Sequence, residues 1–156
     1  MRAMPYSTAD ARQQLLDDLA NAIDELGVAL AVLGDAYEAL DEQTADRMEA
    51  ELFRPVQVTY ARAQRTHAGF AERHGLPTRT FAASATGRGI GHDARSQLDA
   101  ALEAIEEADH LLVEIQDSMM PVEVGDPELR AGLADVRERV TPLPERGSAL
   151  LRTLGR

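Results

Sequence analysis

Several residue types are missing from this chain, and each absence removes a class of chemistry. Cysteine is absent, so the sequence excludes a disulfide bond, a thiolate metal site and a cysteine nucleophile. Lysine is absent too, and all 16 basic residues are arginines. A Schiff-base lysine, a lysine general base and the lysine of a P-loop are therefore excluded.

Long apolar runs are also missing. The sequence has no run of about 18 apolar residues, so we expect neither a membrane-spanning helix nor a membrane partner. Residues 1–6 lack the apolar stretch of a signal peptide, and we therefore expect a cytoplasmic protein. The net charge of −11 argues against nucleic acid as a partner, because nucleic-acid binding needs a basic surface.

The few basic residues are spread unevenly. Between Arg54 and Arg95 the chain holds seven arginines and two acids, whereas the remainder is strongly acidic. One interpretation is a basic helix beside acidic ones, with exposed ion pairs that contribute little to stability. The alternative is a surface that binds an anionic partner or ligand. The candidate anion-binding residues are Arg54, Arg62, Arg65 and Arg73.

Residues 16–40 carry the clearest pattern of the chain. Apolar side chains recur there in two interleaved seven-residue series, Leu16, Ile23, Leu30 and Tyr37 with Leu19, Leu26, Leu33 and Leu40. This spacing is typical of a helix packed in a left-handed bundle. Gly27 and Gly34 flank the series, although glycine costs about 1 kcal/mol relative to alanine inside a helix. We therefore expect a neighbouring helix, most plausibly the second, to press close at both glycines.

Similar apolar stripes predict three further helices. The four predicted helices cover about residues 8–40, 45–74, 93–119 and 127–154. Residues 76–92, rich in glycine and threonine, form the predicted flexible crossover loop. The sequence therefore predicts a single all-α domain over residues 1–156, an antiparallel four-helix bundle.

Caps and prolines refine these boundaries. Ser7 is a good cap for the first helix, and Thr44 for the second after a short connection. Pro55 lies inside the second helix and predicts a kink there. Pro142 and Pro144 predict a kink or break in the last helix, with Thr141 as the cap of the new segment. Residues 120–125 are predicted to form a turn with some extended character.

One line of side chains on the second helix suggests a polar pocket. Tyr60, His67 and His74 recur every seven residues along the edge of the apolar stripe. Together with Asp109 of the third helix they are the candidate ligands of a small molecule or a metal. The two histidines are two turns apart, about 10.5 Å, so one metal could not bind both without distortion. The alternative interpretation is boundary side chains that keep their polar atoms in water.

A second candidate is the sequence Glu107-Ala108-Asp109-His110. Di-iron bundles use two Glu-x-x-His motifs that point inward, whereas this chain has one. Its Glu107 and His110 share a helical face with Glu103 and Glu114, away from the apolar stripe. We therefore expect a solvent-exposed acidic face.

These observations favour a non-catalytic helical bundle that acts as an interaction or structural module. We expect it to work without a cofactor, through a protein partner or through self-association. The alternative is a bundle that binds a metal or small ligand in the polar pocket of the second helix, with or without enzymatic activity.

Overall fold

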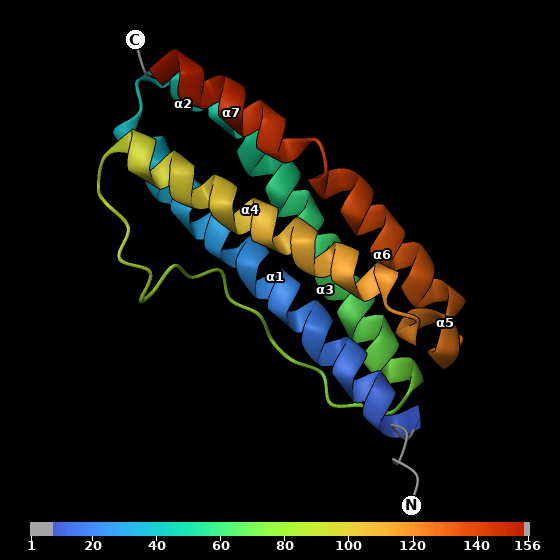
Figure 1. Cartoon of the computed structure of the whole chain (residues 1–156). Coiled ribbons are helices and arrows are strands. Elements are labelled where there is room, and N and C mark those ends of the chain that lie inside the picture. The colour runs from blue at the N-terminus through green and yellow to red at the C-terminus, as the bar shows by residue number, and fades with distance from the viewer. Residues whose placement is uncertain (1–7, 155–156) are drawn as a thin grey trace, which may run out of the picture.

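The first helix is the longest element of the fold. The computed structural model describes residues 8–154, and α1 (Thr8–Ala39) opens this part of the chain (Figure 1). The predicted cap, Ser7, lies outside the described residues. Ile23, Leu26 and Leu33 of the repeating series are fully buried, whereas Tyr37 is 38% exposed. The seven-residue pattern thus marks the buried face of α1, and this face ends about one turn before the helix does.

Three helical segments then follow one another without a gap: α2 (Glu42–Met48), the π-helical segment η1 (Glu49–Phe53) and α3 (Arg54–Arg73). The Asp41 carboxylate accepts the Thr44 amide at 2.9 Å and caps α2. The prediction that Thr44 is the cap is therefore wrong. Asp41 is the earlier of two possible caps, and it lets the helix start three residues sooner than expected.

The second half of the chain contains four helices: α4 (Ala94–Asp117), α5 (Met120–Val124), α6 (Pro127–Val140) and α7 (Leu143–Leu154). The short helix α5 replaces the predicted turn and ends at Gly125, which has φ +71°. The predicted interruption at Pro142 is a break between α6 and α7. Thr141 does not cap the new segment as expected, because its hydroxyl donates to the Arg137 carbonyl at 2.8 Å and closes α6 instead.

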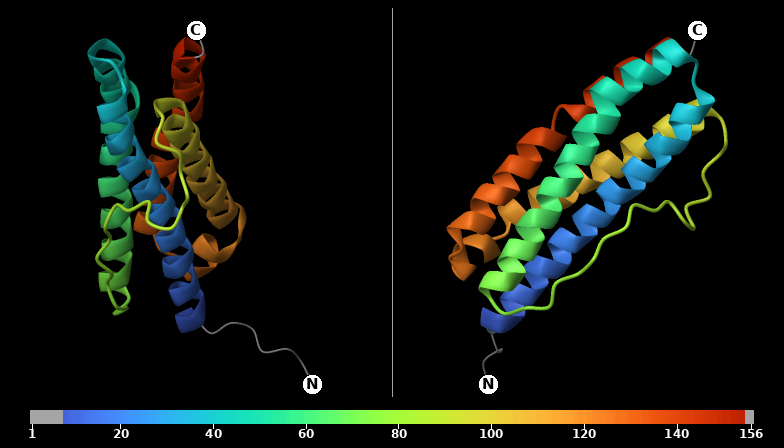
Figure 2. Two further views of the ribbon diagram at one scale, coloured as in Figure 1. Left: turned by 90° about the vertical axis from the view of Figure 1, so that its left-hand side faces the viewer. Right: turned by 180° about the vertical axis from the view of Figure 1, so that it is seen from behind.

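An extended segment of residues 75–93, here called the strap, joins α3 to α4. It runs back along the outside of α1, so that α3 and α4 point in the same direction (Figures 1 and 2). Arg79 binds Asp24 and Arg88 binds Glu25, each at 2.9 Å. The segment that the sequence predicts as a flexible crossover loop therefore has defined contacts with α1.

The two glycines of α1 have different surroundings. A Cβ atom at Gly27 would lie 3.4 Å from the Ala83 Cα of the strap and 3.4 Å from Cε1 of Tyr60. These are ordinary van der Waals distances, and the nearest backbone belongs to the strap, so the expected close approach of a neighbouring helix is not found there. A Cβ atom at Gly34 would meet no atom within 4 Å, so the expected close approach is wrong at that position.

The helices pack as a bundle around one apolar core. Its fully buried side chains come from every long helix and include Ile23, Leu52, Phe70, Leu112 and Val136. In the described residues the fold is all-helical, with no strand, as the sequence predicts. The sequence predicts four helices, whereas residues 8–154 form seven α-helices and one π-helical segment. No helix in this part of the chain combines the length and apolar content that crossing a bilayer requires.

Candidate functional site: an arginine-lined seam

Two helix irregularities, the π-helical segment η1 and the break between α6 and α7, lie on either side of the line where α3 meets α6 and η1 meets α7. On one side the π-helical segment precedes Pro55, and the Arg54 amide bonds to the carbonyl of Glu49, five residues back. Proline has no amide hydrogen, so the Glu51 carbonyl loses its regular helical partner. The Arg146 guanidinium of α7 lies 3.5 Å from that carbonyl and donates to it. Interruptions of this kind often occur at functional sites.

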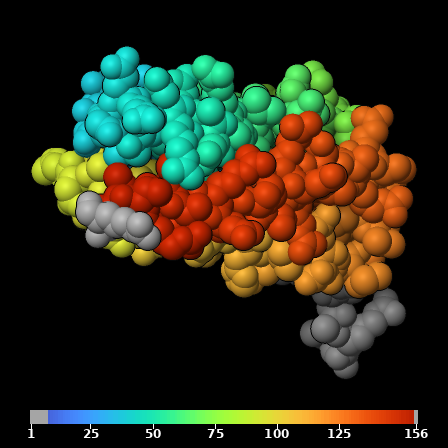
Figure 3. Space-filling view, turned by 90° about the horizontal axis from the view of Figure 1, so that it is seen from above, coloured from blue at the N-terminus to red at the C-terminus, as the bar shows by residue number. Residues whose placement is uncertain are grey.

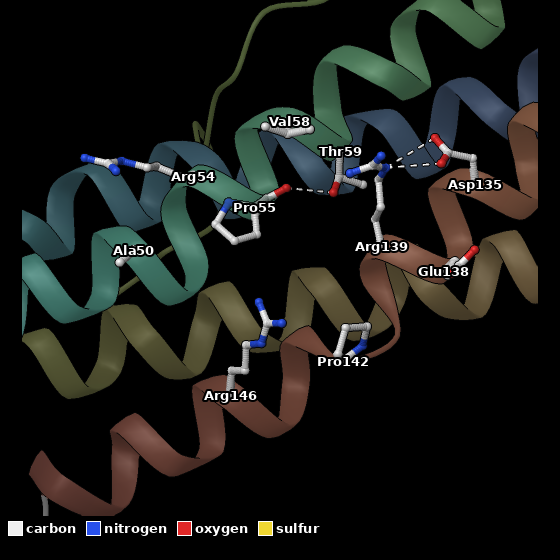
Figure 4. A pocket seen from close by; sticks show the side chains of 10 residues that line it. All are labelled: Ala50, Arg54, Pro55, Val58, Thr59, Asp135, Glu138, Arg139, Pro142 and Arg146. Atoms are coloured by element: carbon white, nitrogen blue, oxygen red, sulfur yellow. Dashed lines mark hydrogen bonds and ion pairs between the residues drawn. The ribbon is translucent and has the colours of Figure 1, made fainter.

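The space between these irregularities is an open groove of about 580 Å³. Figure 3 shows α6 beside α3, and α7 beside α2 and η1, along this face of the molecule. In Figure 4, Arg146 reaches from α7 toward Pro55, and Arg139 extends toward Asp135. Arg54 belongs to the lining but extends away along its helix. Val58, 45% exposed, adds an apolar side chain at the rim. The groove thus offers cationic donors next to an apolar surface.

A second hollow of about 460 Å³ continues the same line between α3 and α6. Arg62, Arg65 and Arg73 line it, and it shares Asp135 with the first groove. We call the two hollows together the arginine seam. Six arginines line the seam, against three acids: Arg54, Arg62, Arg65, Arg73, Arg139 and Arg146, with Glu128, Asp135 and Glu138. In a chain of net charge −11, the seam is a local concentration of positive charge.

The arginines of the seam differ in how far they are neutralised. Arg62 and Arg139 both bind Asp135, each at 3.3 Å. Arg54 and Arg73 are also paired with acids, at 3.1 and 2.9 Å, whereas Arg65 has no ion pair within residues 8–154. Arg146 makes a single long hydrogen bond in the same part of the chain. Of the six arginines, Arg65 and Arg146 therefore keep donors for an added acceptor.

A buried carboxylate fixes the end of the seam nearest α5. Asp126, 4% exposed, caps α6 by accepting the Leu129 amide at 2.9 Å. It also accepts from Nε and Nη2 of Arg73, at 3.0 and 2.9 Å, and lies 2.7 Å from Nε2 of His74. Burial raises the pKa of Asp126, but the bonds to Arg73, Leu129 and His74 outweigh it and lower the pKa to about 2. This cluster holds the end of α3 against the start of α6.

The four residues of the candidate pocket on the second helix have different neighbours in the structure. His74 is bound to Asp126, whereas the ring of His67 meets the edge of Phe81 from the strap at a centroid distance of 5.1 Å. Tyr60 lies against Gly27, and the Oδ1 of Asp109 is buried without a hydrogen-bond partner. Within the described residues, no three histidine or acidic side chains are grouped so that they could hold a metal. A pocket shared by these four residues stays a prediction.

The charged face of α4 lies in solvent, as expected. Glu103, Glu107 and His110 are exposed, and His110 pairs with Glu114 at 3.0 Å. These acids lie on α4, which packs mainly on α1. The second hollow of the arginine seam lies between α3 and α6, and α6 packs mainly on α3.

The structure places all four candidate anion-binding arginines of the second helix along the seam. Sequence reasoning missed Arg139 and Arg146, which α6 and α7 contribute. Their seven-residue spacing was a signal that they share one face, but nothing in the sequence indicates that this face meets α3. Comparisons of the chain with protein-family models, with curated proteins and with solved structures found no match.

Proposed function

We propose that this protein is a non-catalytic interaction module that binds an acidic segment of a partner protein along the arginine seam. In this proposal four helical columns, α1, α2–α3, α4 and α6–α7, form the antiparallel four-helix bundle expected from the sequence. The bundle serves as a rigid frame that holds the arginines of two columns in register.

The observation that carries the proposal is the collection of six arginines along one seam of a strongly acidic chain. Arginine forks match carboxylate geometry and are enriched at protein interfaces. The exposed Val58 and the ring of Pro55 supply apolar contact beside them. A partner segment that alternates carboxylates with apolar side chains fits this combination better than a small inorganic anion does.

The long-range field of the molecule acts against any acidic partner, because the net charge is −11. At physiological ionic strength charges beyond about 8 Å are largely screened, so the local arginines dominate once the partner is seated. We therefore expect binding that is controlled by contacts within the seam and weakened by salt.

Fluorescence anisotropy with a labelled peptide of alternating glutamate and leucine tests the proposal. The matched peptide, with glutamine in place of every glutamate, should bind much more weakly. Each exposed pair contributes about 0.2–1 kcal/mol, so the double variant Arg65→Gln/Arg146→Gln should bind the acidic peptide about fivefold more weakly. Arg152→Gln, an exposed arginine of α7 outside the seam, should bind like the wild type.

Equal binding of both peptides, or an unchanged affinity in the double variant, would refute the proposal. Light scattering on the protein alone tests the expected self-association separately. If the protein is a monomer at all concentrations, then the partner is a different protein. A dimer that the double variant abolishes would identify a second copy as the occupant of the seam.

A further inference from the structure

The strap lies along α1 and helps to bury a histidine of α3. His67 is 3% exposed, and the ring of Phe81 packs against it at a centroid distance of 5.1 Å and an interplanar angle of 87°. Within the described residues the imidazole of His67 makes no hydrogen bond. A protonated imidazole has two N–H donors, and a buried charge without partners is unfavourable. The closed strap therefore suits the neutral form of His67.

The charges near His67 also favour its neutral form. Arg79 of the strap stands over the ring of Phe81, with its guanidinium carbon 4.6 Å from the ring centroid. The charged groups that act on His67 within the described residues are this arginine and Asp17 of α1. Burial and the Arg79 cation lower the pKa of His67, and Asp17 offsets only part of that change. A proton on His67 would thus place a second cation beside Arg79.

The strap is attached to α1 through side chains. Its anchors are the ion pairs of Arg79 with Asp24 and of Arg88 with Glu25, each at 2.9 Å. Exposed ion pairs of this kind contribute little to stability. In the described part of the chain no backbone hydrogen bond joins residues 77–92 to a helix. The strap can therefore move away while the helices stay paired with one another.

We propose that the strap is a pH-operated latch, which closes over neutral His67 and opens when this histidine is protonated. Opening lets water reach the imidazolium and separates it from Arg79. It also uncovers α1 at Gly27, where Ala83 of the strap lies in the closed state. The closed state is fully favoured above the ordinary histidine pKa of 6.5, and this preference is lost as the pH falls below it.

The rate at which a covered thiol reacts measures the opening, because the natural chain has no cysteine. Ala20 of α1 is 6% exposed and lines a hollow together with His67 and Arg79, so Ala20→Cys places the thiol there. Its reaction rate with dithiodipyridine is divided by that of Ala82→Cys, an exposed position of the strap, at the same pH. This ratio should rise at least threefold between pH 7.5 and pH 5, with about 30-fold as the limit for one proton.

Histidine variants in the Ala20→Cys protein identify the group that titrates. His67→Gln should keep the ratio constant, whereas His92→Gln, which changes the exposed histidine of the strap, should behave like the parent. Asp17→Asn removes the offsetting carboxylate and should raise the ratio at pH 5 further, which gives a second test if His67→Gln folds poorly. A flat ratio, an equal rise in His67→Gln, or a rise that follows loss of helical circular dichroism would overturn the proposal.

Discussion

Replacing Asp126 by alanine should be among the most destabilising single changes outside the apolar core. The carboxylate is buried and receives hydrogen bonds from the Leu129 amide and from two nitrogens of Arg73, with His74 Nε2 at 2.7 Å. The variant removes a helix cap, which typically costs about 1 kcal/mol. It also removes charge-assisted bonds, which contribute about 1.5–3 kcal/mol.

The total is smaller than a simple addition gives, because the Arg73 side chain is 32% exposed and water can replace part of its lost partner. We therefore expect Asp126→Ala to lower the free energy of unfolding by about 2–4 kcal/mol. Asp93→Ala is the matched control. Asp93 caps α4 with the same geometry, accepting the Ser96 amide at 3.1 Å, but it is exposed and binds no arginine. Its loss should cost clearly less than the loss of Asp126.

The pH dependence of stability provides a second readout of the same carboxylate. The pKa of Asp126 falls from 3.8 to about 2 on folding, so its contribution is complete above pH 3.8 and is lost as the pH falls toward 2. Between pH 5 and 2 the wild type should lose about 1–2 kcal/mol more than Asp126→Asn, which keeps the cap without the charge. Urea unfolding followed by circular dichroism measures both quantities. If Asp126→Ala costs no more than Asp93→Ala, the buried ion cluster does not stabilise the fold.

Two further predictions concern α1 and the strap. Gly27→Leu should destabilise the protein by about 1–3 kcal/mol through overpacking against Ala83 and Tyr60, whereas Gly34→Ala should stabilise it by up to about 1 kcal/mol. Chemical unfolding tests both, and equal effects of the two variants would contradict the packing described at Gly27. Burial and the nearby Arg79 cation lower the pKa of His67, partly offset by Asp17. Folding then favours neutral His67, so stability should fall as the pH drops through 6.5, more steeply in the wild type than in His67→Gln. Identical slopes would show that His67 is not held in a neutral, buried state.

The periodic parts of the fold could be predicted from the sequence. A helix in a bundle must bury one face, and the series through Ile23 and Leu26 therefore marks α1 directly. The first residue of a helix is harder to predict where two nearby residues could each cap it, as Asp41 and Thr44 could for α2. Helix α5 was missed because five residues are too few to show a period. Its best signal was Gly125, which ends the helix in a left-handed conformation.

The strap and the complete seam could not be predicted, because both depend on contacts between distant segments. The glycines and threonines of residues 75–93 predict an irregular segment. They do not predict the ion pairs that Arg79 and Arg88 form with α1. The arginines of α3 could be recognised as a basic cluster from the sequence. Arg139 and Arg146 join them only because α6 packs along α3 and α7 packs on η1, and apolar periodicity alone does not select those neighbours.

The side-chain Nε–Hε signals of the arginines offer the most direct test of the central claim, that the seam binds an acidic partner segment. These signals can be followed by NMR while the alternating glutamate–leucine peptide is added. Binding along the seam predicts large, saturable shifts for Arg65 and Arg146, and unchanged signals for Arg152 outside it. Uniform small shifts of all the arginines, or shifts confined to Arg79 and Arg88 on the strap, would contradict the account.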